Sequence, residues 1–138
     1  MIIKELLREG KNMQDHKLNF MEMFKKFLPI AMQYIEIDSL PEMEFVTHVP
    51  EDDQPTFGRY ENDQNRLTVA LINRHPNDIL RTIAHELVHY RQDMRGELND
   101  KSGETGSPHE NQAHEIAGIV MRHFNKKYPE FLKSEPIT

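Results

Sequence analysis

Apolar side chains recur at helical spacing near the start of the chain. In residues 13–28 they occupy every third or fourth position, which predicts a helix with one apolar face. These positions are Leu18, Met21, Phe24 and Leu28. A shorter amphipathic helix is predicted over residues 1–12, ending at Gly10. Pro29 is expected to end or restart the longer helix, because proline has no N–H to donate, with residues 30–37 as a continuation.

The middle of the chain alternates strand-forming and turn-forming segments. Residues 43–49 are rich in β-forming side chains, and residues 56–60 and 66–72 fit two further strands. The polar segment 61–65 predicts a hairpin between the last two, and the acidic, proline-bounded stretch 50–55 predicts a surface loop. Together these segments predict a small antiparallel three-stranded sheet with the strands in sequence order.

Two more amphipathic helices are predicted in the second half. Residues 77–95 have a broad apolar side, formed by Ile79, Leu80, Ile83, Ala84, Leu87, Val88 and Met94. Ser107 followed by Pro108 is typical of a helix N-terminus and predicts a helix to about residue 127. The glycine-containing segment 96–108 between the two helices is interpreted as a connector or a lid.

The pattern as a whole predicts an α+β fold in a single domain, residues 1–138. Residues 1–40 form a helical N-terminal part, and residues 41–127 hold the sheet and the two later helices. Residues 128–138 are expected to be an irregular tail, because they carry two prolines. A chain of this length is large enough to bury a real core.

Composition narrows the classes of function. With 17 Lys and Arg against 23 Asp and Glu, the formal net charge is −6, which disfavours nucleic acid and anionic membranes as partners. Cysteine is absent, so a metal would have to be held by His, Asp or Glu. We see no apolar run of the roughly 18 residues that a membrane span needs and no signal peptide, and therefore expect a cytoplasmic protein.

Residues 85–89 form an H-E-x-x-H motif on the predicted helix 77–95. His85 and His89 are four positions apart, so they share the face opposite the apolar side and can each offer a ring nitrogen to one Zn²⁺. Glu86 is then placed to act as general base on a metal-activated water. The alternative is a surface helix with two solvated histidines.

A catalytic zinc usually has three protein ligands. Gln92 and Arg95 stand where the longer H-E-x-x-H-x-x-G-x-x-H pattern has Gly and His, which argues against the metzincin class. Glu110 is the candidate third ligand, because it lies near the apolar stripe of the helix that follows Ser107. The alternative is a capping box, in which Ser107 and Glu110 only satisfy the backbone at the start of that helix.

Other polar residues near the motifs are also candidates. His109 and His114 are rival ligands or groups that line the site, whereas Glu115 is expected on the solvent side of its helix. Tyr90, His109, His114 and Arg95 are unranked candidates for stabilising an oxyanion in the transition state. Asp93, one turn after His89, is interpreted either as a residue that orients a ligand or as a solvated carboxylate.

Three short segments together resemble the ImmA/IrrE-like family of small gluzincin metallopeptidases: Leu71-Ile72-Asn73, RTIAHELVH at 81–89, and Glu110-x-x-Ala113 with Ala117. The chain is still more similar to short metallopeptidase-like proteins of tailed bacteriophages, which share Gly106-Ser107-Pro108 and Glu110-Asn111. The similarity covers residues 67–124. It departs from the family at His114 and Glu115, which replace the Asn-x that often follows E-x-x-A.

The resemblance implies one Zn²⁺ per chain held by His85, His89 and Glu110, with Glu86 as general base in the hydrolysis of a protein or peptide. It implies a minimal gluzincin-like fold and, for a phage protein, the host cytoplasm. We take residues 67–71 as the candidate sheet edge for binding an extended peptide. The alternatives are a non-catalytic zinc-binding module that acts on a partner protein, and a metal-free helical adaptor.

Overall fold

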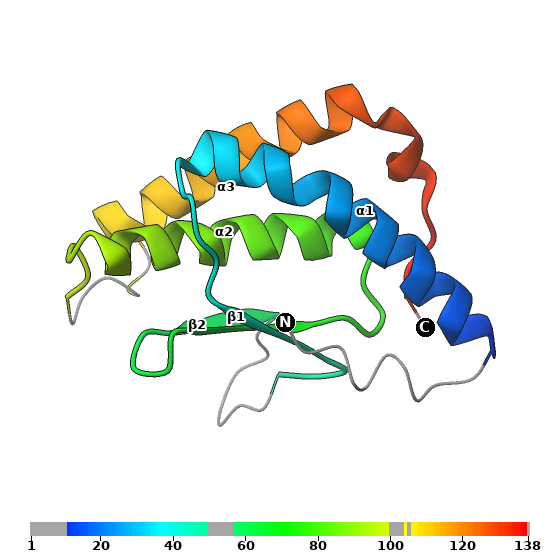
Figure 1. The fold of residues 1–138 in the computed structure, drawn as a ribbon, viewed down its shortest axis with the longest axis horizontal. Helices are drawn as coiled ribbons and strands as arrows, with labels where there is room; N and C mark the ends of the chain where they lie inside the picture. Colours follow the sequence, from blue (N-terminus) through cyan, green and yellow to red (C-terminus); the bar gives the residue numbers. More distant parts are fainter. Residues whose placement is uncertain (1–10, 50–56, 100–103, 105, 138) are drawn as a thin grey trace.

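Three long helices stack on one side of a small sheet in the described part of the chain (Figure 1). The computed structural model describes residues 11–49, 57–99, 104 and 106–137. Within these residues the elements are α1 Lys11–Ile35, β1 Glu42–Val46, β2 Gly58–Glu61, β3 Arg66–Ala70, α2 Pro76–Met94, α3 Pro108–Lys127 and the 3₁₀ helix η2 Pro129–Lys133. The predicted α+β class is confirmed.

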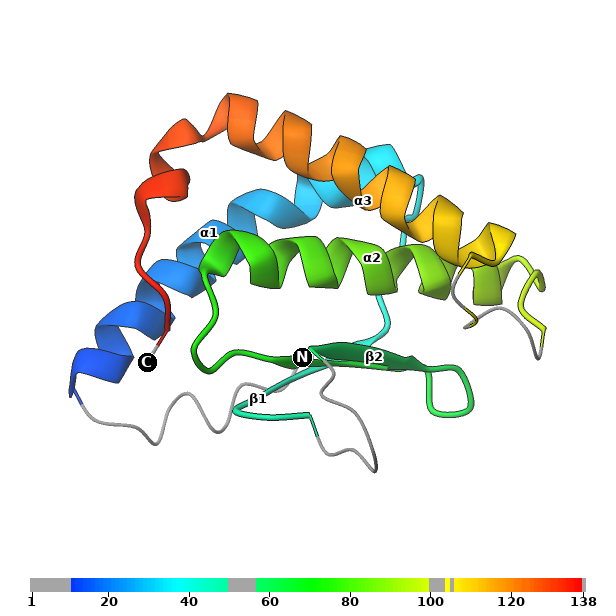
Figure 2. The same ribbon diagram turned by 180° about the vertical axis from the view of Figure 1, so that it is seen from behind.

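α2 lies between the sheet and α3, and α1 packs against α2 and α3 (Figures 1 and 2). This central position follows from the apolar side predicted for the helix, because its side chains contact the core: Ile79, Leu80, Ile83, Ala84, Leu87 and Val88 are all fully buried. A narrower sector of α2 carries His85, Glu86 and His89, which are only partly buried. Core packing therefore fixes the direction in which the motif faces.

The sheet is mixed, not antiparallel as predicted. Its order is β1-β3-β2, with β3 antiparallel to β2 and parallel to β1. The predicted hairpin of β2 and β3 is confirmed, but the order of the strands and the edge position of residues 67–71 are wrong. Residues 67–70 are buried on both faces of the sheet, as expected of a central strand, whereas β2 is partly exposed throughout. The alternation of side chains does not encode the direction of a partner strand, so the sequence pattern missed this pairing.

α1 runs through Pro29 to Ile35, so the proline neither ends nor restarts the helix as predicted, whereas the predicted continuation beyond it is present. Phe24 and Phe27 before the proline and Ile30 and Ala31 after it are buried in the same core. Phe27 also meets Phe124 of α3, with ring centroids 5.9 Å apart. Packing on both sides of the proline thus compensates for the hydrogen bond that it cannot make. The helix predicted over residues 1–12 falls almost wholly outside the described residues.

The C-terminal tail is more ordered than predicted. It contains η2, and Ile137 beyond it is buried and bridges to Arg74 through a hydrogen bond from its N–H to the Arg74 carbonyl, 3.0 Å long. Within the segment predicted as a connector or a lid, 96–108, residues 100–103 and 105 lie outside the described residues. No helix in the described ranges combines the length and the apolar character that crossing a membrane requires.

Candidate metal centre

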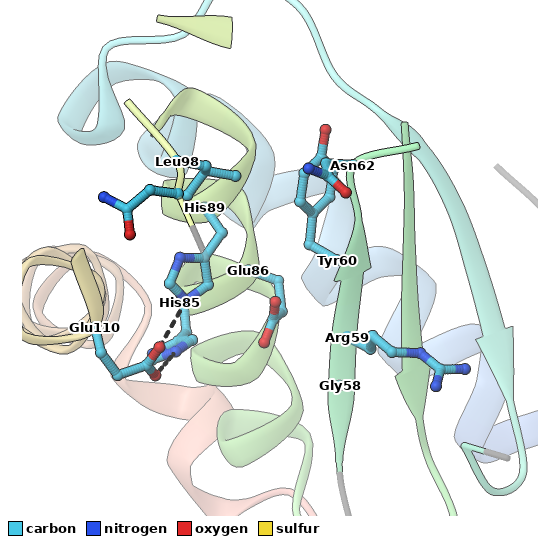
Figure 3. Close-up of a pocket in the computed structure, with 10 residues that line it drawn as sticks. Gly58, Arg59, Tyr60, Asn62, His85, Glu86, His89, Leu98 and Glu110 are labelled. Atoms are coloured by element: carbon cyan, nitrogen blue, oxygen red, sulfur yellow. Dashed lines mark ion pairs between the residues drawn. The ribbon is translucent and has the colours of Figure 1, made fainter. Parts of the chain in front are cut away.

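The first turn of α3 is arranged so that Glu110 faces α2. Ser107 is the N-cap and Pro108 the first helical residue, as predicted, and Ser107 Oγ accepts a hydrogen bond from the Glu110 N–H at 3.1 Å. The Ser107 N–H, which a capping box would pair with the glutamate side chain, donates to the Glu104 carbonyl at 3.0 Å. The Glu110 carboxylate turns instead toward the two histidines of the motif (Figure 3).

The side chains of His85, His89 and Glu110 converge in space. Glu110 Oε1 lies 2.6 Å from His85 Nε2, and Glu110 Oε2 lies 3.1 Å from His89 Nε2. One ligand atom from each residue lies within 4.8 Å of the other two. These side chains are 15%, 13% and 20% exposed, so solvent can reach them without surrounding them.

This group of donors fits a single metal ion. A tetrahedral cation with bonds of about 2.0–2.1 Å holds its ligand atoms about 3.3 Å apart. The separations here bracket that value, from 2.6 Å to at most 4.8 Å. Two imidazole nitrogens and one carboxylate could therefore hold a metal ion after small movements of the side chains.

Burial shifts the pKa values of two residues in the motif. It lowers the pKa of His85, and the adjacent Glu110 carboxylate opposes this effect. A lowered pKa favours the neutral imidazole, which is the form that binds a metal. Burial also raises the pKa of Glu86 to about 7, while His89 and the main-chain N–H of Tyr60, which donates to the Glu86 carboxylate, act in the opposite direction.

Strand β2 approaches α2 closely beside Glu86. A Cβ atom at Gly58 would collide with Thr82 Cγ2 of α2, and it would lie 3.5 Å from Glu86 Cγ. Only glycine therefore permits this approach without a shift of the strand or the helix. The approach allows the Tyr60 N–H to reach the Glu86 carboxylate.

The convergent groups open into a cavity of about 460 Å³ (Figure 3). β2 and the following turn form one wall, with Tyr60 and Asn62, and the motif face of α2 forms another. Glu110 of α3, with Leu98 and Asn99 after α2, completes the lining among the described residues. A substrate in this cavity would meet Glu86 and the candidate ligands together.

Asp93 and Tyr90, which the sequence offered as supporting residues of the site, do not contact the candidate ligands in the contacts that the structure shows. Asp93 accepts a hydrogen bond from Tyr60 Oη at 2.5 Å and so fixes β2, whereas Gln92 is the residue that contacts His89 Nδ1, at 2.8 Å. Tyr90 is buried, and its Oη is 2.6 Å from Ser39 Oγ, outside the cavity lining.

The histidines of α3 are close to the centre without completing it. His114 Nε2 is 3.7 Å from Glu110 Oε1, but its side chain is 71% exposed. His109 contributes its main-chain carbonyl to Gln92 Nε2. Arg95 instead lies 3.9 Å from Glu36, and Glu115 is exposed, as predicted. Of the candidates for oxyanion stabilisation, His114 is the one that the geometry leaves beside the candidate ligands.

Three residues that contact the candidate site were not predicted from the sequence: Gly58, Tyr60 and Gln92. An isolated glycine in a strand is itself a signal of close backbone approach, and Gly58 carries that signal. Gln92 is three positions after His89 and so shares its side of the helix. Tyr60 acts at Glu86 through its main chain, which no pattern of side chains reveals.

Comparison with known proteins gives no relative: no family model, no curated protein and no solved structure matches the chain. The resemblance noted in the sequence therefore stays a hypothesis. The side chains gathered at this centre are therefore the basis for assigning a function.

Proposed function

We propose that the chain is a zinc-dependent metallopeptidase of the gluzincin type. The observation that carries this proposal is the convergence of His85, His89 and Glu110 in one cavity with Glu86. A glutamate from the helix after the motif, in place of a third histidine, distinguishes this set of ligands from that of the metzincins. His85, His89 and Glu110 would hold the metal ion.

Zinc is the metal that this group of donors suits best, because imidazole and carboxylate are common zinc ligands and three protein ligands leave a position open. When bound, it would supply a Lewis acid that polarises a peptide carbonyl and lowers the pKa of a water molecule to about 7.

Glu86 would move the proton. With a pKa of about 7, its carboxylate can take a proton from the attacking water at one oxygen and later give it to the leaving amine nitrogen. The Tyr60 N–H, by donating to this carboxylate, orients it in the cavity. Asp93 fixes the Tyr60 side chain and so supports this arrangement.

A peptide in extended conformation suits the shape of the site. β2 is an edge strand and forms a wall of the cavity, so a segment of substrate lying along β2 would pass beside Glu86. The sequence pattern predicts this role for residues 67–71, but β3 is the central strand and has no open edge. Strand addition would therefore involve β2.

The decisive experiment combines metal analysis with a cleavage assay on a peptide library. Purified wild-type protein should carry about one zinc per chain and cleave peptides. Glu86→Gln should keep the metal and lose at least about 10²-fold in activity, the low end of what a general base contributes.

Full activity in Glu86→Gln would refute the assignment of the base. Stoichiometric zinc with no cleavage of any library peptide would favour the non-catalytic binding module instead. If the protein binds no zinc after reconstitution, both the metallopeptidase and the zinc-binding module are refuted.

A further inference from the structure

Gln92 lies between the metal-ligand helix and the helix that carries Glu110. It is fully buried, yet its amide makes three hydrogen bonds. Its Oε1 is 2.8 Å from His89 Nδ1, and its Nε2 donates to the His109 carbonyl at 3.0 Å and to Gln112 Oε1 at 2.8 Å. Because the amide oxygen can only accept and the amide nitrogen can only donate, this buried side chain determines which neighbouring atoms must be donors and which must be acceptors.

The polarity of these bonds determines which nitrogen of His89 carries a hydrogen. The His109 carbonyl can only accept, so the Gln92 amide group must present its NH₂ to α3. Its oxygen then faces His89 Nδ1 and can only accept in turn, which requires a hydrogen on Nδ1. Nε2 is left as the atom of His89 that can bind a cation, and it is this atom that faces Glu110.

The same amide holds the second ligand-bearing segment. His109 and Gln112, which accept its two hydrogens, flank Glu110 in the first turns of α3. One buried side chain therefore both orients a ligand on α2 and fixes the backbone that presents a ligand on α3. We propose that Gln92 is a positioning residue of the metal centre, an inference that rests on the proposed function in taking His89 and Glu110 as ligands.

A second hydrogen bond between α2 and α3 serves as a control, because it joins the two helices without contacting a candidate ligand. Asn77 and Asn125 also join α2 to α3, by a hydrogen bond of 2.7 Å from Asn77 Nδ2 to Asn125 Oδ1, and neither contacts a ligand. If Gln92 only held the helices together, loss of either link should affect the metal alike. If Gln92 orients His89, the two should differ.

The test measures zinc affinity by competition with a chromophoric chelator in Gln92→Met and in the control Asn125→Leu. Methionine keeps the volume of glutamine but makes no comparable hydrogen bond. We expect Gln92→Met to weaken zinc binding about 10–100-fold, the usual effect of losing a group that orients a ligand. Asn125→Leu should stay within about twofold of the wild type.

A second readout does not need the metal. ¹⁵N-edited NMR of the His89 ring, recorded at fixed pH with and without zinc, should show a hydrogen on Nδ1 in the wild type in both states. Gln92→Glu should retain this signature, because a carboxylate still accepts from Nδ1, and Gln92→Met should lose it. If Gln92→Met does not fold, the wild-type spectrum still tests the inference, because a ring without a hydrogen on Nδ1 would contradict it.

Three results would each overturn the inference. Gln92→Met could bind zinc as tightly as the wild type, or Asn125→Leu could lose as much zinc affinity as Gln92→Met. The His89 ring of the wild type could also lack a hydrogen on Nδ1. These results are distinct from failure of the proposed function. A wild-type protein that binds no zinc would refute the metallopeptidase, while the metal-free NMR comparison would still decide whether Gln92 fixes the His89 ring.

Discussion

Glu110 serves two purposes through different parts of the same residue. Its main-chain N–H completes the N-terminus of α3 by donating to Ser107, and its carboxylate contacts His85 and His89. The capping and ligand interpretations of this residue, which compete in the sequence, are thus compatible in part. The carboxylate lies against both imidazoles, which is the position that the ligand interpretation requires.

At the scale of the residue we predict that His89→Ala abolishes zinc binding. The truncation removes one of three ligands, and zinc held by the remaining two should be lost on dialysis against a weak chelator. Metal content per chain, measured by atomic emission, checks this result.

Two other histidines provide the controls for this prediction. His114→Ala should keep about one zinc per chain, because the His114 side chain is 71% exposed to solvent. His48→Ala, at an exposed position after β1, should also keep it. Loss of zinc in His114→Ala would make His114 a ligand, and retention in His89→Ala would refute the proposed centre.

At the scale of the element, the contact between β2 and α2 depends on a residue without a side chain, Gly58. Gly58 permits it, and the Tyr60 N–H then reaches Glu86. The edge strand and the helix are therefore positioned together with respect to the cavity. A change that separates them should disturb Glu86 without touching a candidate ligand.

We predict that Gly58→Ala destabilises the fold by about 1–3 kcal/mol, the usual cost of overpacking, because the new methyl group would collide with Thr82. Urea denaturation measures this change, and peptide cleavage should fall while zinc content stays near one per chain. The matched control is Gly118→Ala in α3, where a Cβ atom meets nothing within 4 Å. That substitution should stabilise the fold by about 0.5–1 kcal/mol, since glycine is a poor helix former. Equal effects of the two substitutions would contradict the proposed contact.

At the scale of the whole molecule, the candidate centre joins α2 to α3 at one end of their contact. The opposite end is held by the Asn77–Asn125 pair and by the aromatic core that α1 shares with α3. The helices are thus packed independently of a metal. We infer that a cation would add to a fold that already exists rather than create it.

We therefore predict that the metal-free protein is folded and that zinc raises its melting temperature. At a free zinc concentration 100 times the dissociation constant, binding to the native state alone adds about 2.7 kcal/mol. Thermal melts followed by circular dichroism, with EDTA and then with excess zinc, check the prediction. His89→Ala should show no such shift, and a protein that is unfolded in EDTA would contradict the inference that the core is independent of the metal.

The amino-acid sequence by itself determined the helices of the second half, their N-terminal boundaries to within a residue or so, and the hairpin of β2 and β3. It also singled out His85, Glu86 and His89 by their spacing along one helix, and Glu110 by its position near the apolar stripe of the next helix. Such signals are complete within a few neighbouring residues. The structure brings all four to one cavity.

Only the tertiary structure decided the features that depend on distant neighbours. The parallel pairing of β1 with β3 and the uninterrupted passage of α1 through Pro29 both follow from packing that the local pattern does not contain. The same holds for Gln92, whose hydrogen-bond partners on α3 lie as many as 20 positions away. A linear pattern records which faces are apolar, but the partner of each face is chosen by the simultaneous burial of all of them.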